Sequence, residues 1–334
     1  MNVTVLGAGS WGTALTILLA RNGHDVTLFG RPSEDLEVMR ATRENMRYLP
    51  GFLLPKDVQL ISWDEEAPET DMWVVAVPSP AVRGVLPRIQ GESPLVVLAS
   101  KGLEPMGPQM LHQLCAEMIP GGRIGALSGP NLAVEIVRGI PTAAIAAFAD
   151  AKDSEIVRYA FLCRTFRVYV SEDVTGVELA GALKNVLAIG AGISDGLGFG
   201  DNTKGALLAR GLREMILIGQ AMEAKFETFL GIAGVGDLFA TAVSKLSRNY
   251  RVGRSIGEGL SLRQALDSIG QVAEGVATSE AAMRLSRQHQ VPMPVFETIE
   301  AVLHGRVRPL DGVSMLMERM TLTEGGFDAT CLKS

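Results

Sequence analysis

A glycine-rich turn at the start of the chain limits its fold more than any other feature. The buried strand expected over Asn2–Leu6 leads into Gly7, Gly9 and Gly12, and an apolar helix follows over Ser10–Asn22. In this Gly-x-Gly-x-x-Gly pattern the first glycine permits the tight turn, the second lets backbone approach a pyrophosphate, and the third lets the helix pack closely on the strand. Free N–H groups and the positive dipole end of the helix then face the anion. The pattern therefore predicts a Rossmann unit that binds a dinucleotide, the alternative being an ordinary βαβ turn without a ligand.

The rest of the chain divides into two patterns. Short β-branched segments alternate with helical ones as far as residue 175, which indicates a mostly parallel sheet with helices on both faces. Long apolar-periodic segments follow, so the predicted class is α/β, with a Rossmann domain over residues 1–175 and an all-helical substrate domain over residues 176–334. The polar residues 324–334 are expected to form a loose tail. Further strands are expected at Asp25–Phe29, Val58–Ile61, Met72–Val77, Leu95–Ser100, Arg123–Leu127, Thr142–Ala147 and Arg167–Val170, and helices at Gly176–Ile193, Asn202–Glu223, Ser261–Ser268, Thr278–Gln288 and Met293–Leu303.

Composition excludes several classes of function. Lys and Arg total 31 against 37 Asp and Glu, and a net charge of −6 gives no long-range attraction for nucleic acid or an anionic membrane. We expect no leader peptide before the first strand, and no apolar run approaches the roughly 20 residues that span a bilayer. The three cysteines have no metal-ligand spacing, so neither a disulfide framework nor a metal site is expected. These features favour a cytoplasmic enzyme that acts on a small molecule.

The end of the second predicted strand bears on the choice of cofactor. A carboxylate about 20 residues after the glycines binds a free ribose 2′-hydroxyl, whereas an arginine accommodates a 2′-phosphate. This chain has Arg31 there, followed by Pro32, and no carboxylate. We therefore expect NADP or NAD as cofactor, with NADPH used at least as well as NADH. The alternative is that Arg31 is a solvent-exposed arginine with no ligand. Lys101, at the carboxyl end of the fifth strand, is expected near the nicotinamide or the substrate.

A lysine is the best candidate for acid/base chemistry. The four histidines lie in no motif, whereas Lys184 and Asn185 interrupt an otherwise apolar helix. Burial there would lower the pKa of the lysine towards working pH, unless its stem carries the ammonium out to water. The segment 190–204 is too rich in glycine for an ordinary helix and predicts a close-approach turn at a site.

A second polar cluster has the chemistry of a phosphate site. Asp237 precedes Ser247, Arg248 and Asn249 by a short stretch of chain. Arginine offers a bidentate fork to a phosphate monoester, while serine and asparagine supply short directional donors. Taken singly, Asp237 could instead cap a helix, and Arg248 could be a surface charge.

These segments together resemble the bacterial type of NAD(P)-dependent sn-glycerol-3-phosphate dehydrogenases. The matching blocks run in the family's order across nearly the whole chain: residues 7–14, 48–51, 100–104, 128–130, 183–186, 196–202, 234–238, 246–249 and 272–276. The resemblance implies a Rossmann domain followed by a helical domain, and reversible reduction of dihydroxyacetone phosphate to sn-glycerol 3-phosphate for phospholipid synthesis.

The resemblance also implies roles for individual residues. Lys184 is the implied catalytic acid/base, with Asp237 beside it. The implied substrate-binding residues are Lys101, Gly129, Asn131, Lys184, Asp237, Ser247, Arg248 and Asn249. The implied cofactor-binding residues are Gly7, Gly9, Ser10, Trp11, Gly12, Arg31, Lys101, Ala133, Arg248, Val272 and Glu274.

This chain departs from the family pattern at two positions. Pro32 stands where the family often has a second basic residue, so we expect a weaker hold on a 2′-phosphate. Asn131 stands where the family usually has serine or threonine; its amide can still donate and accept a hydrogen bond.

Two other functions fit parts of the pattern. The 6-phosphogluconate and hydroxyisobutyrate dehydrogenases also join a Rossmann domain to a helical domain with a Lys-Asn pair, but their substrates carry a carboxylate. A non-catalytic nicotinamide sensor is more remote, because it has no use for Lys184 and Asp237 beside a phosphate site. Exposed apolar faces on a helical second domain would fit a homodimer.

Overall fold

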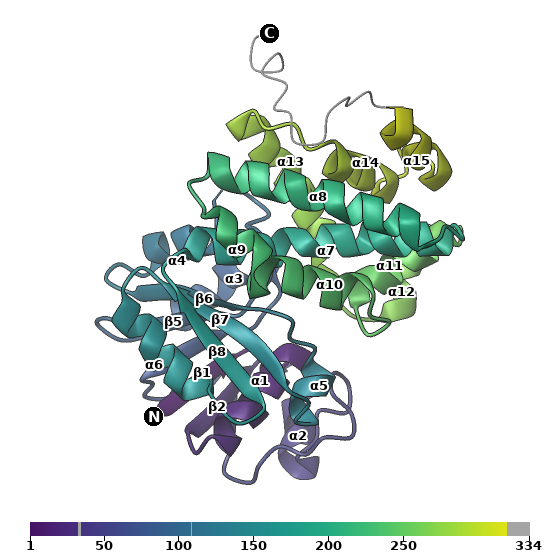
Figure 1. The fold of residues 1–334 in the computed structure, drawn as a ribbon. Coiled ribbons are helices and arrows are strands. Elements are labelled where there is room, and N and C mark those ends of the chain that lie inside the picture. Colours follow the sequence, from purple (N-terminus) through teal and green to yellow (C-terminus); the bar gives the residue numbers. More distant parts are fainter. Residues whose placement is uncertain (33–34, 108, 319–334) are drawn as a thin grey trace.

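The computed structural model describes residues 1–32, 35–107 and 109–318. A layer built on one eight-stranded sheet forms the lower half of the molecule in Figure 1, and a group of helices forms the upper half. The strands are β1 (Asn2–Leu6), β2 (Asp25–Gly30), β3 (Gln59–Ser62), β4 (Met72–Val75), β5 (Leu95–Leu98), β6 (Arg123–Ser128), β7 (Thr142–Phe148) and β8 (Phe166–Ser171). The helices of the sheet layer are α1 (Ser10–Arg21), α2 (Leu36–Thr42), α3 (Ser79–Val85), α4 (Leu111–Met118), α5 (Ala133–Val137) and α6 (Ala151–Phe161).

The second half is helical throughout its described residues. Its elements are α7 (Val174–Gly196), α8 (Asp201–Ala221), α9 (Phe226–Leu230), the π-helical turn η3 (Ile232–Gly236), α10 (Asp237–Ala242), α11 (Arg248–Gly257), α12 (Leu262–Ile269), α13 (Glu274–His289), α14 (Pro294–Leu303) and α15 (Pro309–Glu318). The predicted fold class is confirmed. The predicted tail over residues 324–334 lies outside the described residues.

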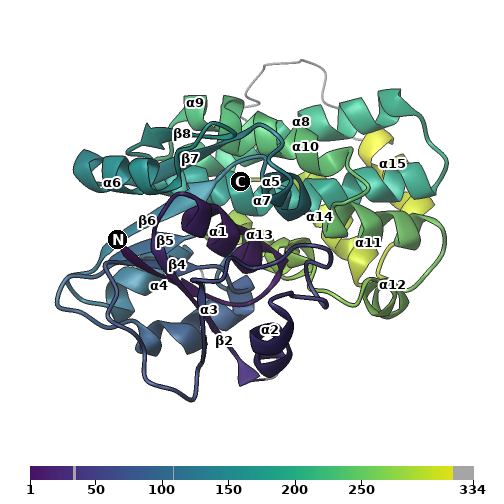
Figure 2. The same cartoon turned by 90° about the horizontal axis from the view of Figure 1, so that it is seen from below.

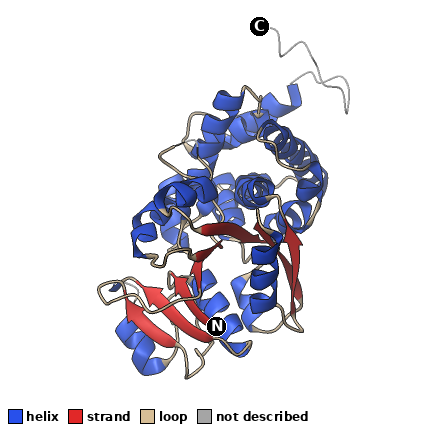
Figure 3. Cartoon of the chain, turned by 90° about the vertical axis from the view of Figure 1, so that its left-hand side faces the viewer, coloured by secondary structure: helices blue, strands red, loops and turns tan. Residues whose placement is uncertain are grey.

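The order of the strands places a crevice beside β1. The sheet runs β3-β2-β1-β4-β5-β6-β7-β8, and its pairs are parallel except β6 with β7. The chain moves outward from β1 to β3 and then returns to β4 on the other side of β1, so β1 and β4 form the switch point at which open α/β sheets bind ligands. Helices cover both faces of the sheet (Figure 3), which explains why the strands are apolar on both sides.

Helix α7 is the central element of the helical half. It lies between the sheet and the outer helix α8 (Figure 1), and is 23 residues long. Contrary to the sequence prediction, it is long and apolar enough to cross a membrane, with a mean hydropathy of 1.3 over 18 residues. That window is completely buried within the fold, and its two charged side chains are paired. Glu178 accepts a hydrogen bond from His112 Nδ1 at 2.7 Å, and Lys184 lies 3.0 Å from Asp237. Helix α7 is therefore a core helix.

The glycine-rich segment 190–204 contains a turn between α7 and α8, with Gly198 at φ +80°, but none of its residues lines the cavity at the sheet edge. Helix α7 continues to Gly196, and a Cβ atom on Gly192 would lie 2.1 Å from the Tyr250 carbonyl oxygen. A Cβ on Gly253 of α11 would likewise lie 1.9 Å from the Ile189 carbonyl oxygen. The glycines let two helix backbones touch, which side chains would prevent. The turn was therefore predicted correctly but its place at a site was not, because helix packing at Gly192 and a turn at Gly198 both favour glycine.

Candidate active site

One cavity of about 310 Å³ opens at the carboxyl end of the sheet, against the helical half. Most of the predicted site residues line it: Gly9, Ser10, Trp11, Lys101, Asn131, Ala133, Lys184, Asp237, Ser247, Arg248, Asn249, Val272 and Glu274. In the view from below (Figure 2), α1 and α5 of the sheet layer lie in front of α7 and α13 of the helical half. Both halves of the chain therefore contribute to one site.

The glycine turn after β1 has the geometry of a pyrophosphate cradle. Gly7 has φ +107°, and a Cβ there would lie 2.7 Å from Val77, while a Cβ on Gly12 would lie 1.9 Å from the Gly7 carbonyl oxygen. A Cβ on Gly9 would meet nothing within 4 Å, so Gly9 borders open space that a larger residue would fill. Its neighbours Gly7 and Gly12 lie behind the cavity wall. The turn and the N-terminus of α1 fit a dinucleotide.

Asn45 holds this turn in place from the side away from the cavity, and no sequence motif indicated this residue. Its buried amide donates to the Ala8 carbonyl and to Thr13 Oγ1, both at 2.8 Å. Because Ala8 belongs to the turn and Thr13 to α1, one side chain holds the two parts of the cradle together.

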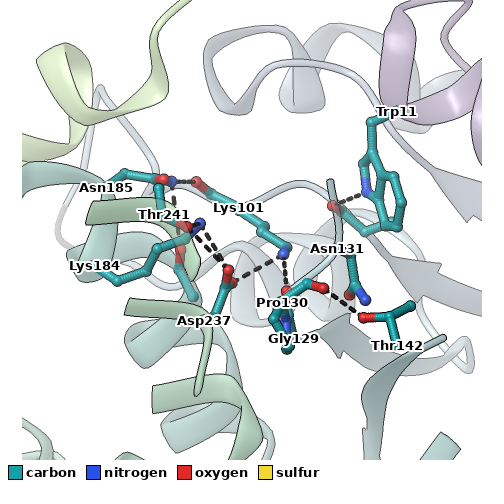
Figure 4. A network of polar contacts seen from close by, with 12 residues as sticks. Trp11, Lys101, Gly129, Pro130, Asn131, Thr142, Lys184, Asn185, Asp237 and Thr241 are labelled. Carbon is teal, nitrogen blue, oxygen red and sulfur yellow. Dashed lines mark hydrogen bonds and ion pairs between the residues drawn. The ribbon is translucent and has the colours of Figure 1, made fainter. Parts of the chain in front are cut away.

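Lys184, Asp237 and Thr241 form a buried polar triangle in the cavity (Figure 4). Lys184 Nζ lies 3.0 Å from Asp237 Oδ1 and donates to Thr241 Oγ1 at 2.6 Å. Thr241 Oγ1 in turn donates to Asp237 Oδ1 at 3.1 Å. The side chains of Lys184 and Asp237 are only 6% and 2% exposed, so this ion pair is shielded from water. Thr241 lies one helical turn after Asp237, a spacing that could have revealed it in the sequence.

Lys101 reaches the same carboxylate from the sheet. Its Nζ donates to Asp237 Oδ2 at 2.9 Å and to the Gly129 carbonyl at 2.6 Å (Figure 4). The Trp11 ring centroid lies 5.8 Å away, and Trp11 Nε1 donates to the Ala99 carbonyl at 2.9 Å. Gly129 does not line the cavity, and its carbonyl instead holds Lys101 after the carboxyl end of β5.

Two lysines on one carboxylate leave the centre with a positive charge. An ammonium has three N–H donors, and the described contacts occupy two on Lys184 and two on Lys101. Each lysine therefore has one donor left for an oxygen atom in the cavity. The arrangement suits a ligand oxygen that carries or develops negative charge.

Burial tunes the acidity of Lys184. Desolvation lowers the pKa of Lys184 to about 8, although the Asp237 carboxylate opposes this by favouring the charged form. Lys101 and Arg248 lower it further through repulsion. An ammonium with a pKa near neutrality exchanges protons more readily than an ordinary lysine, as a general acid/base requires.

The Ser247–Asn249 cluster lies where α11 begins. Ser247 caps this ten-residue helix by accepting from the Tyr250 amide at 3.2 Å. Asn249 is tied into the core, because its amide donates to Asn185 Oδ1 at 2.8 Å and its Oδ1 accepts from the Gly275 amide at 3.0 Å. Arg248 differs: in the described part of the chain its guanidinium makes no hydrogen bond or ion pair, yet it lines the cavity. A positively charged helix end with an unpaired guanidinium is a ready anion site.

Glu274 links the two halves of the chain. It accepts hydrogen bonds from the Ser79 amide at 2.9 Å and from Ser79 Oγ at 2.5 Å, across 195 residues of sequence. Burial raises the pKa of Glu274, while the two Ser79 bonds and Arg248 lower it. Glu274 also lines the cavity, where the half-exposed Val272 lies beside it.

The side-chain amide of Asn131 has one atom that is hydrogen-bonded and one that is not, among the described residues. Its Nδ2 donates to the Ala143 carbonyl at 3.0 Å, which fixes the amide orientation because a carbonyl can only accept. The Asn131 Oδ1 atom is buried, with no hydrogen-bond partner among the described residues. Since Asn131 lines the cavity, it offers an acceptor to a ligand donor.

Arg31 is a predicted cofactor-binding residue that does not line the cavity. It follows β2 outside the cavity lining, with its guanidinium carbon 6.0 Å from the Trp63 ring centroid. This is the strand end at which Rossmann proteins hold the adenosine ribose, so Arg31 lies where the adenosine end of a dinucleotide is expected.

Fold and site together define a class of protein: an oxidoreductase that binds a nicotinamide dinucleotide on a Rossmann layer and a small molecule against a helical layer. Comparisons with known proteins identify the family. Residues 2–154 match the family described as the NAD-dependent glycerol-3-phosphate dehydrogenase N-terminus, and residues 173–314 match its C-terminus. The chain belongs to this family, as the sequence resemblance predicted.

Individual relatives agree over nearly their full length. The chain is 45% identical over 323 residues to glycerol-3-phosphate dehydrogenase, NAD(P)+, of Thermoanaerobacter sp. (strain X514), covering 96% of this chain and 97% of the relative. A relative of the same name from Geobacter sulfurreducens is 45% identical over 324 residues, covering 95% and 97%. The crystal structure of glycerol-3-phosphate dehydrogenase from Coxiella burnetii superposes with a TM-score of 0.91 at 35% identity, covering 95% of this chain and 99% of that one.

Proposed function

We propose that this protein reversibly reduces dihydroxyacetone phosphate to sn-glycerol 3-phosphate with NAD(P)H, supplying glycerophospholipid synthesis. The observation that carries the proposal is the Asp237 carboxylate shared by Lys101 and Lys184, in the cavity that the glycine cradle also borders. This places a positively charged centre with two unused N–H donors at the carboxyl end of the sheet.

Lys184 is the proposed proton donor. When bound, the nicotinamide supplies the hydride that reaches the carbonyl carbon. Lys184 donates a hydrogen bond to the carbonyl oxygen and then transfers its proton to it, so the growing charge is neutralised. Asp237 and Thr241 hold the ammonium in place, and in the reverse direction the neutral amine accepts the alcohol proton.

The substrate phosphate is proposed to bind at the start of α11. Arg248 provides the bidentate fork, with Ser247 and Asn249 as further donors, which matches a phosphate monoester better than a carboxylate. Lys101, held by Gly129, contacts the substrate from the sheet side. The unpaired Oδ1 of Asn131 accepts from the free hydroxyl group of the substrate.

The cofactor is proposed to lie along the sheet edge from the glycine cradle to Arg31. Gly7, Gly9 and Gly12 shape the cradle, and the proposed contacts with the rest of the dinucleotide are Ser10, Trp11, Arg31, Lys101, Ala133, Arg248, Val272 and Glu274. Arg31 supports use of NADPH at least as readily as NADH.

A panel of substrates tests this proposal against the carboxylate-specific alternative. We expect NADH and NADPH oxidation with dihydroxyacetone phosphate and little with the 3-oxo acids of the 6-phosphogluconate and hydroxyisobutyrate group. Turnover of the oxo acids alone would contradict the phosphate assignment, and absence of turnover with every phosphate ester would support the sensor hypothesis.

Domain division, assembly and location remain part of the proposal. We place the division near residue 175, between β8 and α7, and the enzyme in the cytoplasm. Phe239 of α10 and Val243, which directly follows the helix, are 60% and 58% exposed, and Leu246 is 53% exposed. This apolar surface supports a homodimer, which sedimentation analysis would test.

A further inference from the structure

Two arginines distant in the sequence approach the same indole beside the carboxyl end of β2. The guanidinium carbon of Arg88 lies 4.8 Å from the Trp63 ring centroid, and that of Arg31 lies 6.0 Å from it. Arg31 directly follows β2, whereas Arg88 ends the 3-10 turn Leu86–Arg88 after α3. Each contact is of the ordinary cation–π kind. The two contacts gather two guanidinium groups around one indole beside this strand end.

Trp63 is a fixed platform for these charges. Its Nε1 donates to the Phe29 carbonyl at 2.9 Å, and its backbone amide donates to the Gly30 carbonyl at 2.9 Å. The ring also packs against the apolar cluster under β2 and β4. Both hydrogen bonds tie the indole to the last residues of β2, where a Rossmann domain holds the adenosine ribose.

The charge of Arg88 is not neutralised within the described part of the chain. Its Nη1 donates to the Gly84 carbonyl at 3.2 Å, while its Nε is buried without a hydrogen-bond partner. Nearby Arg40 provides the contrast, because it forms ion pairs with Glu37 and Glu65. The guanidinium of Arg88 therefore has no carboxylate partner among the described residues, whereas that of Arg40 has two.

We propose that Arg88 is a second binding residue for a 2′-phosphate on the adenosine ribose, acting with Arg31 and held in place by Trp63. The inference rests on the proposed function and deepens it by naming the 2′-phosphorylated dinucleotide as a preferred cofactor. Pro32, the residue after Arg31, carries no charge, so Arg88 supplies the second cation from another part of the sheet layer. A guanidinium suits this role because its planar fork matches phosphate oxygens.

Binding of nucleotide fragments to the whole protein tests the inference without any turnover. Calorimetry would compare 2′,5′-ADP with 5′-AMP, which lacks the 2′-phosphate, for the wild type and for Arg88→Gln. We expect the variant to lose roughly ten- to a hundredfold in affinity for 2′,5′-ADP, the range for one charge-assisted hydrogen bond, and to bind 5′-AMP normally. The matched control is Arg167→Gln, since Arg167 also lies over an aromatic ring, Tyr169 at 5.4 Å, but on β8 at the opposite edge of the sheet.

The other outcomes are separable. Unchanged affinity for 2′,5′-ADP, or an equal loss for both nucleotides, would overturn the role of Arg88 and leave the proposed function standing. A wild type that binds both nucleotides equally would overturn the 2′-phosphate site altogether, whereas reduction of dihydroxyacetone phosphate with NADH would still test the reaction. Arg88→Lys provides a second variant: it keeps the charge, so we expect a smaller loss that remains sensitive to salt.

Discussion

At the scale of single residues, the site depends on one carboxylate placed between two lysines. The interrupted apolar pattern indicated Lys184, the end of the fifth strand indicated Lys101, and the polar cluster indicated Asp237, before the family resemblance implied their roles. None of these signals could show that Lys101 and Lys184 meet on opposite oxygens of Asp237, because 136 and 53 residues of chain separate them from it and only the fold brings them together. Two further contacts were unpredictable for the same reason, because they join residues that are far apart in the sequence: Asn45 with Ala8, and Ser79 with Glu274.

The pKa of Lys184 predicts opposite pH dependences for the two reaction directions. Because burial lowers this pKa to about 8, the ammonium dominates below that pH and the amine above it. Reduction needs the ammonium, so its kcat/KM should fall as pH rises through about 8, while that for oxidation should rise over the same interval. Rate profiles in both directions would measure this, and a reduction rate constant from about pH 7 to pH 9 would argue against Lys184 as the acid.

Arg248 predicts a selective loss of phosphate recognition. Arg248→Lys retains a positive charge but loses the planar fork, so KM for dihydroxyacetone phosphate should rise about tenfold or more. Because Arg248 is also one of the proposed cofactor contacts, KM for the dinucleotide should rise as well. Steady-state kinetics with unphosphorylated dihydroxyacetone is the control: an equal loss of activity with that compound would mean that Arg248 does not anchor the phosphate.

At the scale of elements, the strands and the longest helices were predictable, whereas several shorter helices were not. Each observed strand begins and ends within two residues of its predicted first and last residues, because β-branched runs between turns are a strong signal for strands. Helices α9 and α10 were missed, since five or six residues on either side of a glycine-rich π-helical turn show no clear periodicity. Helix α11 was also missed, although Ser247 as N-cap followed by buried Val252 and Ile256 is a usable signal.

The contact between α7 and α11 predicts that its glycines are required for stability. Gly192→Ala would place a Cβ 2.1 Å from the Tyr250 carbonyl oxygen and force the helices apart. We expect the free energy of unfolding to fall by about 1–3 kcal/mol or more. Gly205→Ala on α8 is the matched control, because a Cβ there meets nothing within 4 Å and should stabilise the helix by about 0.5–1 kcal/mol. Urea unfolding would measure both, and equal effects would show that the close approach is unimportant.

At the scale of the whole molecule, one active site requires both halves of the chain. Ser79 and Glu274 form one direct link between them, and Asn185, which donates to the Lys101 carbonyl at 2.9 Å, forms another. Such cross-contacts keep the cradle of the sheet layer and the lysine of α7 at a fixed separation, which hydride transfer demands.

The Ser79 link predicts a measurable loss of stability. Ser79→Ala removes the hydroxyl donor to Glu274 and leaves a half-buried carboxylate with one bond fewer, so unfolding free energy should drop by about 1–3 kcal/mol. Ser93→Ala is the control, because its hydroxyl donates to the Gly121 carbonyl at an exposed site and should change stability by less than about 0.5 kcal/mol. Chemical denaturation of both variants would decide whether the link matters, and indistinguishable midpoints would show that it does not.

The most direct test of the account is turnover by Lys184→Ala with dihydroxyacetone phosphate and saturating NADPH. Loss of the positioned acid should lower kcat by roughly 10²–10⁴, while dinucleotide binding measured by fluorescence stays near that of the wild type. Retention of most of the wild-type kcat would contradict the account, because the proton would then have to come from another group.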